Sequence, residues 1–481
     1  MNRLIGEWAR RHWPYLVTGL VFVASRWFYR NVLSITFDTS ALDYYIQYID
    51  PWYMEHDFLR SFWYLHNQGP LLNLLIAVLL RLFGKPAAMD ILEALFLLFS
   101  FATVLGLLHI ARRLGARAGI ACLICSFYAV SPTTVIYENW LFYHLPVALG
   151  LVLTVLALIH YHRVRTFWAA FAVFAIIAVI ALIRSTFGPL FLVVTLGLLL
   201  WRPPLGPKPK SARRTLLLAA AGPLVLLCLH NLKPMVLIGY GYGDSFLYGN
   251  IAQKIGDQLS PDQRQRLHET NAVSPMIEHF FLTDLKEFGD LLIPHAPTGV
   301  PLLDDANAPN GRSNAHALQY LLLNNAYSKS DARYLMTHYP DLYLKSVSDG
   351  LRQYAGSSLE AMLPGTPNYV HTRVPREAID KLLGAREDKT FPTLAVALPL
   401  LFLYAVVRAL WVRRPSRLCS ANALLLVVLM VGYVSAVAIL ISAGDYARYR
   451  SEIDPLYFLL LILCLSELRV PRFLLARVRV R

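Results

Sequence analysis

Charged residues are scarce in this sequence. Only 16% of its 481 residues are charged and 56% are hydrophobic, with a mean hydropathy of +0.46, whereas about a quarter of the residues of a soluble protein are charged. Long uncharged runs such as "ANALLLVVLMVGYVSAVAILISA" (421–443) are long enough to cross a lipid bilayer. The composition therefore excludes a soluble globular protein and predicts a membrane protein with several crossings.

Several local signals are absent as well. Among the five cysteines, Cys122 and Cys125 form a C-x-x-C pair, but no histidine or further cysteine lies nearby, which favours buried thiols over a metal or redox site. The chain has no glycine-rich nucleotide fingerprint, no internal repeat and no low-complexity tract. The first apolar run (14–35) carries Arg26 and Arg30 and lacks a small-residue cleavage site, so it is not a cleavable signal peptide.

Apolar runs and basic loops together predict the topology. Arginine and lysine gather in alternate short loops and at both ends of the chain, which places these segments and both termini in the cytoplasm. This placement explains the net charge of +14 without a nucleic-acid partner. The ten predicted crossings are 14–35, 88–111, 118–136, 142–160, 166–183, 186–201, 215–233, 391–409, 419–442 and 453–469.

The short apolar stretch at residues 70–84 is not counted among these crossings. It is too short to span, and counting it would invert every following loop up to residue 234. We expect it to lie along the outer surface as a juxtamembrane helix. The sequence then divides into an N-terminal membrane module (1–233) with a first outer loop (37–87), a mostly helical outer region (234–389), and C-terminal membrane helices with a basic inner tail (390–481).

Two aspartates follow the first predicted crossing in "TFDTSALDYYIQYID". A carboxylate at the membrane surface, shielded by aromatic rings, can serve as a general base. For Asp38, which precedes Thr39 and Ser40, helix capping explains the residue equally well. Asp43 lies inside the expected helix, where capping explains less, and we therefore favour Asp43 as the catalytic base.

Glu138 and His144 lie at the outer turn in "SPTTVIYENWLFYHLP". They are candidates for binding an acceptor or steering a proton. The alternatives are a merely solvated carboxylate and a structural histidine.

Three arginines are expected at the outer face, against the usual charge bias. Arg184 lies in "ALIRSTFGPL", and Arg448 and Arg450 lie in "AGDYARYRSEIDPLYFLL". Guanidinium groups bind phosphates through paired hydrogen bonds. The alternatives are snorkelling of Arg184 and an exposed ion pair with Glu452.

A carboxylate and several arginines at one membrane face suit a lipid-linked phosphosugar. Arginines would stabilise the leaving phosphate, and the carboxylate would take the proton from an acceptor hydroxyl. The absence of a nucleotide fingerprint fits such a lipid-bound donor.

The order of these motifs resembles the GT-C superfamily of membrane glycosyltransferases, which includes protein O-mannosyltransferases and lipid A aminoarabinose transferases. The resemblance rests on Asp43 leading into "YY…Y", on "WYLHNQGPLLNLL", and on "ARYRSEIDPLYFLLLI". It implies an all-α, GT-C-like helical bundle of about ten transmembrane helices. It also implies a polyprenyl-phosphate sugar donor, inverting transfer at the extracytoplasmic face, and a first-loop aspartate as base. The lysine that often precedes the family's Pro-Pro pair has no counterpart, and His66 and Gln68 are candidate substitutes in binding the donor phosphate.

Other readings remain open at this point. A flippase or transporter of lipid-linked saccharides is the main alternative, although transporters place polar residues at mid-membrane and often contain repeats. A lipid-binding scaffold is a third. The acceptor is a glycan, a lipid or a protein, membrane lipids are partners, and a divalent cation is possible without a diagnostic ligand spacing. The style of the juxtamembrane motif favours a bacterial inner membrane.

Overall fold

The polypeptide is built from helices. The structure, a computed structural model, describes residues 2–45, 47–202, 209–241, 244–278, 284–356, 366–383, 393–411, 418–444 and 446–468. Within these ranges the only β-type pairs are two isolated bridges, Asp38 with Trp140 and Asn307 with Ser313. The all-α prediction is therefore confirmed for the described part of the chain.

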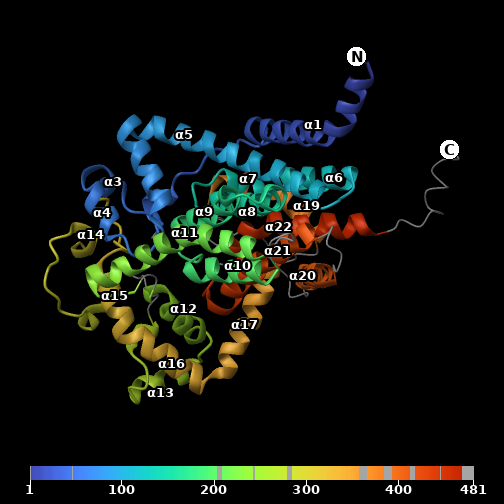
Figure 1. Cartoon of the computed structure of the whole chain (residues 1–481). Coiled ribbons are helices and arrows are strands. Elements are labelled where there is room, and N and C mark those ends of the chain that lie inside the picture. The colour runs from blue at the N-terminus through green and yellow to red at the C-terminus, as the bar shows by residue number, and fades with distance from the viewer. Residues whose placement is uncertain are drawn as a thin grey trace.

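Long helices form a bundle that occupies the centre of the molecule (Figure 1). Each predicted crossing coincides with a helix or a pair of helices. The bundle contains α1 (Asn2–Asn31), α5 (Pro70–Arg113), α6 (Ala118–Val130), α7 (Pro132–Glu138), α8 (His144–Val164), α9 (Phe167–Ile183), α10 (Pro189–Trp201), α11 (Pro209–Ile238), α20 (Thr393–Trp411), α21 (Leu418–Ala436) and α22 (Tyr446–Glu467). Proline occupies the first helical position of α5, α7 and α10, where its missing N–H costs nothing.

Five described helices are long and apolar enough to cross a membrane, and a sixth span results if α6 and α7, bent by 56°, are one crossing. Helices α9 and α10 are apolar but shorter. Helices α1, which contains Arg26 and Arg30, and α22, whose first turns are charged, are not in this group. The chain is an integral membrane protein, and its described residues contain fewer fully apolar spans than the ten predicted crossings.

Helix α8 lies at the centre of the bundle, in contact with α5, α9, α21 and α22. Close approach depends on two glycines. A Cβ added at Gly106 would lie 2.7 Å from Val152, and one at Gly150 would lie 2.6 Å from Ile180. Small residues allow membrane helices to pack at this distance.

Gly84 divides α5 into two helices. Its positive φ of 73° is favourable only for glycine, and Figure 1 shows the two parts of α5 running in different directions. Residues 70–83 therefore form a separate short helix, as the sequence predicts. Its location along the membrane surface stays a prediction.

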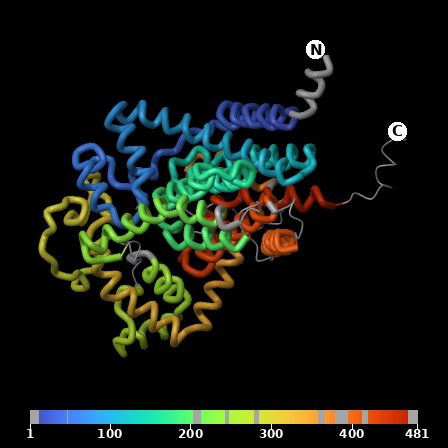
Figure 2. Tube along the Cα trace, in the orientation of Figure 1, coloured from blue at the N-terminus to red at the C-terminus, as the bar shows by residue number. Residues whose placement is uncertain are grey.

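Short helices form a second layer at one end of the bundle. The first loop contributes α2 (Ala41–Tyr44), α3 (Pro51–His56) and α4 (Phe58–Tyr64). The outer region contributes α12 (Asp244–Gly256), α13 (Pro261–Glu269), α14 (Pro301–Asp304), α15 (Leu318–Leu323), α16 (Lys329–His338), α17 (Pro340–Ala355), α18 (Pro367–His371) and α19 (Arg373–Leu383). Helices α4 and α14 are in contact although they are far apart in sequence (Figure 2). The expectation of a mostly helical outer region is met by its described residues, whereas the domain limits stay a prediction.

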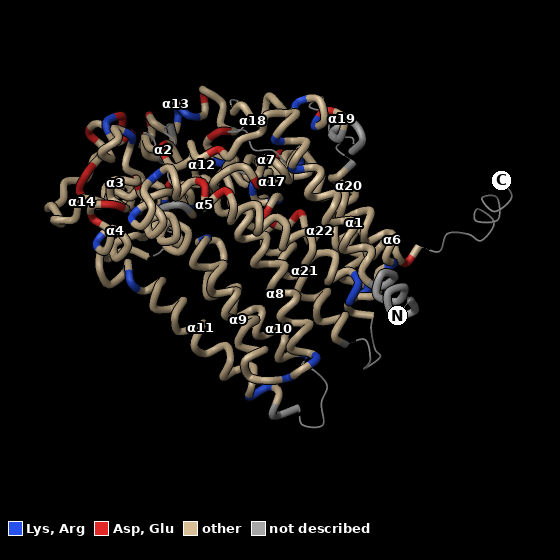
Figure 3. Tube along the Cα trace, turned by 90° about the horizontal axis from the view of Figure 1, so that it is seen from above, with Lys and Arg blue, Asp and Glu red and all other residues tan. Residues whose placement is uncertain are grey.

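Charge is distributed unevenly between the two ends of the bundle. Figure 3 shows acidic residues gathered around the short helices α2, α12, α14 and α17. Basic residues occur among these short helices too, and they also lie at the opposite end of the bundle, near the ends of α10 and α11. Mixed charge at one end and basic charge at the other is the pattern expected if the short-helix layer is extracytoplasmic.

Candidate functional site

The first loop is joined to the turn before α8 by backbone hydrogen bonds. The Asp38 amide donates to the Asn139 carbonyl at 2.7 Å, and the Leu141 amide donates to the Asp38 carbonyl at 2.8 Å. This bridge fixes residues 38–45 against residues 139–144.

An aromatic–arginine cluster, consisting of Tyr45, Phe142, Tyr143, Arg184, Arg448 and Tyr449, lies beside this bridge. The buried guanidinium of Arg448 lies 5.4 Å from the Tyr45 ring and 5.7 Å from the Tyr143 ring. The Arg184 guanidinium also lies near the Tyr143 ring, at 4.5 Å. Cations are attracted to aromatic faces at this range. The cluster therefore brings together four segments that the sequence analysis singled out separately.

Arg184 also forms an ion pair with Glu452. Their side chains are 2% and 0% exposed, respectively, and the Arg184 guanidinium lies 4.1 Å from the Tyr449 ring. The sequence suggested an exposed ion pair of Glu452 with Arg448 or Arg450. In the structure Glu452 is buried and pairs with Arg184 instead. A phosphate at Arg184 would have to compete with this carboxylate.

Arg450 is held by backbone groups at the end of α17. It donates to the carbonyls of Tyr354 at 2.5 Å and Gly356 at 2.8 Å, and its Nε lies 3.6 Å from a carboxylate oxygen of Asp454. These contacts attach the outer region to α22, and the predicted phosphate role of Arg450 stays untested.

Asp38 and Asp43 have different surroundings. The Asp38 carboxylate accepts from the Ser40 amide at 2.9 Å and from the Ser40 hydroxyl at 2.5 Å, which are local hydrogen bonds of the turn before α2, whose N-cap residue is Ser40. The Asp43 carboxylate is 60% exposed and lies 3.9 Å from Nζ of Lys85, which is itself 58% exposed. Asp43 is therefore the more accessible of the two candidate bases.

Lys85 was not singled out by the sequence. It follows the turn at Gly84, which brings the start of the second part of α5 back toward α2. The "GKP" triplet at 84–86 is the local signal, because glycine followed closely by proline marks a break in a helix.

Arg312 and Asn310, from the outer region, also escaped the sequence analysis. Arg312 donates to the carbonyls of Tyr45 at 3.3 Å and Tyr48 at 2.9 Å, and its Nε lies 3.8 Å from a carboxylate oxygen of Asp50. Asn310 donates to the Asp43 carbonyl at 3.5 Å. The outer region therefore helps to position the first loop, a long-range contact that no local pattern announces.

His66 and Gln68 are buried residues of the first loop. Gln68 accepts from the Ser185 hydroxyl at 2.9 Å, next to Arg184. A Cβ at Gly69 would lie 2.4 Å from the Leu182 carbonyl oxygen, so only glycine fits there. These residues connect the juxtamembrane segment to the end of α9, and their predicted phosphate role stays untested.

The buried rings of His66 and His316 lie 6.4 Å apart. Burial lowers the pKa of His66 to about 4, with Lys233 as a further cause. Burial, together with His66 and Arg312, lowers the pKa of His316 to about 3. Both histidines are therefore neutral at neutral pH, and protonating them requires charge in a buried site.

These shifts predict that the outer layer becomes unstable in acid. Below the ordinary histidine pKa of 6.5 the unfolded chain binds protons that the folded chain excludes. Unfolding should therefore become easier by up to about 1.4 kcal/mol per histidine per pH unit between pH 6.5 and 4. Thermal unfolding of the purified protein across this range measures the effect. His316→Phe should flatten the pH dependence, whereas His56→Phe, an exposed histidine of α3, should leave it unchanged.

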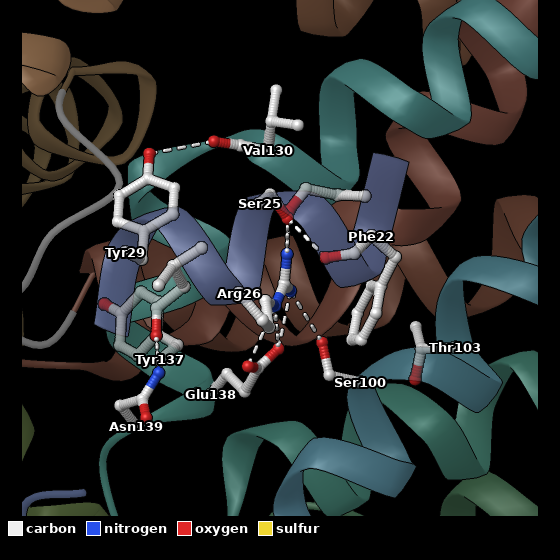
Figure 4. A network of polar contacts seen from close by, with 12 residues as sticks. Phe22, Ser25, Arg26, Tyr29, Ser100, Thr103, Val130, Tyr137, Glu138 and Asn139 are labelled. Carbon is white, nitrogen blue, oxygen red and sulfur yellow. Dashed lines mark hydrogen bonds and ion pairs between the residues drawn. The ribbon is translucent and has the colours of Figure 1, made fainter. Parts of the chain in front are cut away.

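Glu138 is buried against Arg26 (Figure 4). Nε of Arg26 donates to both carboxylate oxygens of Glu138, at 2.9 and 3.0 Å, and further Arg26 donors reach Ser25, Ser100 and the Ala129 carbonyl. His144 is also buried, with Nε2 2.9 Å from the Tyr137 carbonyl. Both positions are those of structural residues, and a role in binding an acceptor or steering a proton stays untested.

Within the described ranges, no group of three histidine, cysteine or acidic side chains is arranged to hold a metal ion. The divalent cation that the sequence left open therefore gains no site among these residues.

Comparisons of sequence find no match for this chain, whereas a comparison with solved structures does. No family model and no curated protein sequence matches the chain. An archaeal oligosaccharyltransferase, AglB from Archaeoglobus fulgidus, in complex with an inhibitory peptide and a dolichol-phosphate, is similar with 10% sequence identity and a TM-score of 0.43. The match covers 98% of this chain and 54% of that chain, so the chain spans about half the length of this structure. The proposals below rest on the chain's own residues.

Proposed function

We propose that this protein transfers a sugar from a polyprenyl-phosphate carrier to an acceptor at the extracytoplasmic face of a membrane, with inversion at the sugar carbon. The acceptor is a glycan, a lipid or a protein. A bacterial inner membrane, with both termini in the cytoplasm, is the proposed location.

One observation carries the proposal. An exposed carboxylate, Asp43, lies beside an exposed ammonium group, Lys85, and two residues before Tyr45, whose ring contacts the Arg448 guanidinium. An acid and an ammonium group therefore lie together at the surface, and the buried Arg448 guanidinium lies against the ring of the nearby Tyr45. A carrier lipid would present its phosphate and sugar at such a surface.

Each group has a role in the proposed reaction. Asp43 takes the proton of the acceptor hydroxyl while the hydroxyl oxygen attacks the sugar carbon. The bond from that carbon to the phosphate oxygen breaks at the same time. Lys85 and Arg448 stabilise the negative charge on the departing carrier phosphate. We assign Arg312 a positioning role, because it binds the backbone on the far side of Tyr45.

The proposal is tested with a radiolabelled polyprenyl-phosphate hexose and purified full-length protein. Lys85→Gln should weaken donor binding by about tenfold or more, because a hydrogen bond to a charged group contributes about 1.5–3 kcal/mol. Equilibrium binding and release of polyprenyl phosphate are measured together, with membrane extract as the acceptor source. Lys345→Gln, which removes an exposed lysine of α17, is the matched control.

Two results would contradict the proposal. One is a wild-type protein that does not bind the donor. The other is movement of intact donor across a vesicle membrane without cleavage, which would identify a transporter of lipid-linked saccharides.

A further inference from the structure

A cavity of about 330 Å³ lies between α1, α5 and α7, behind the segment that carries Glu138. We propose that it binds the headgroup of an aminophospholipid of the surrounding membrane, of the phosphatidylethanolamine class. None of the groups assigned to the proposed transfer reaction lines this cavity, so the two proposals stand or fall separately.

The floor of the cavity is a satisfied charge pair. Arg26 and Glu138 line the cavity, and their side chains are only 11% and 3% exposed. The Arg26 guanidinium uses its donors on Glu138, Ser25, Ser100 and the Ala129 carbonyl (Figure 4). A ligand therefore meets a rigid floor without net charge.

The rim carries a second pair with accessible charges. Arg30 and Glu93 form an ion pair, with side chains 59% and 28% exposed, and both line the cavity. A pair with one exposed and one partly buried partner near the surface contributes little stability by itself, so a ligand with both charges can replace it at small cost.

The walls are apolar and open outward. Val23 and Trp27 line the cavity while 62% and 64% exposed, and Leu97 is 38% exposed. On a membrane helix such side chains face lipid, and tryptophan is enriched at the level of the headgroups. The walls therefore lead from the cavity to the place where acyl chains lie.

Charge complementarity selects the occupant. Two arginines and two glutamates line the site, so a purely anionic lipid would leave the rim carboxylate without a cation. A zwitterionic headgroup places its phosphate at Arg30 and its ammonium at Glu93. A primary ammonium donates three hydrogen bonds whereas a choline group donates none, so phosphatidylethanolamine is preferred over phosphatidylcholine.

Native mass spectrometry of the full-length protein tests this inference. Protein stripped of lipid by detergent is mixed with phosphatidylethanolamine, phosphatidylcholine or phosphatidylglycerol of identical acyl chains. Wild-type protein should retain one phosphatidylethanolamine at least about tenfold more readily than the other lipids, the margin of one charged hydrogen bond. Glu93→Gln should abolish this preference, and Arg30→Gln should weaken retention of phospholipid generally.

Two further variants keep the test decisive. Leu97→Trp fills the mouth of the cavity without altering a charge and should prevent retention, while Arg60→Gln, an exposed arginine of α4, should have no effect. Unchanged thermal unfolding identifies variants that fold. Equal retention of all three lipids, retention that survives Leu97→Trp in folded protein, or displacement of the lipid by polyprenyl phosphate would overturn the proposal.

Discussion

Asp43→Asn is expected to lower sugar transfer by about 10²–10⁴-fold, the usual contribution of a positioned general base. The amide is nearly the same size as the carboxylate, but it does not accept the proton of the acceptor hydroxyl. Because Asp43 is exposed and its described side-chain contact is the 3.9 Å approach to Lys85, the change should leave the fold intact. Donor binding should persist, since the phosphate contacts lie on other residues.

The measurement compares donor binding with turnover in the same purified preparation. Glu55→Gln removes an exposed carboxylate of α3 in the same loop and should retain full activity. Asp38→Ala should lower stability by about 1 kcal/mol, because it removes the side-chain oxygen that accepts the hydrogen bonds of the Ser40 amide and hydroxyl. If Asp43→Asn turns over at the wild-type rate, Asp43 is not the base.

Removing one partner of the Arg184–Glu452 pair is expected to cost about 3–5 kcal/mol of folding stability. Glu452→Leu would leave the guanidinium buried between the rings of Tyr143 and Tyr449 without its carboxylate. The double variant Arg184→Met/Glu452→Leu should recover much of the loss, because no charge then remains buried. Chemical unfolding of the purified protein, analysed as a double-mutant cycle, gives the coupling between the two residues.

Arg373→Ala is the control for this cycle. Arg373 pairs with Glu377 on the surface of α19, with side chains 72% and 50% exposed, and its removal should not change stability measurably. If the two single variants and the double variant at positions 184 and 452 all lower stability by the same small amount, the buried pair contributes nothing to folding.

Most of the architecture could be predicted from the composition and from the lengths of the apolar runs. Apolar runs located the bundle helices, and the basic loops predicted the separation of charge visible between its two ends. Gly84 was within reach of sequence reasoning, because the length of the preceding apolar run and the position of the basic loops both required a break there. The number of fully apolar spans was harder to predict from the sequence. Arg26 lies inside α1, and its charge is compensated by Glu138, which is 112 residues away in sequence.

The site was predictable as a set of segments and not as a set of contacts. Asp43, Arg184 and Arg448 were each identified by their unusual polarity at the end of an apolar run. Their partners were not, because the choice of Glu452 for Arg184, or of the Tyr45 carbonyl for Arg312, depends on tertiary packing. Lys85 was overlooked because its proximity to Asp43 arises from the turn at Gly84.

The order in which the chain is synthesised gives the aromatic–arginine cluster a consequence of its own. Arg448 and Tyr449 of the cluster, and Glu452, the partner of Arg184, belong to α22, the last described helix, whereas the other members of the cluster come from the first half of the polypeptide. A nascent chain that has inserted every earlier helix still lacks both the second guanidinium and the counter-charge of Arg184. The proposed transfer reaction therefore becomes possible only after α22 has joined the bundle.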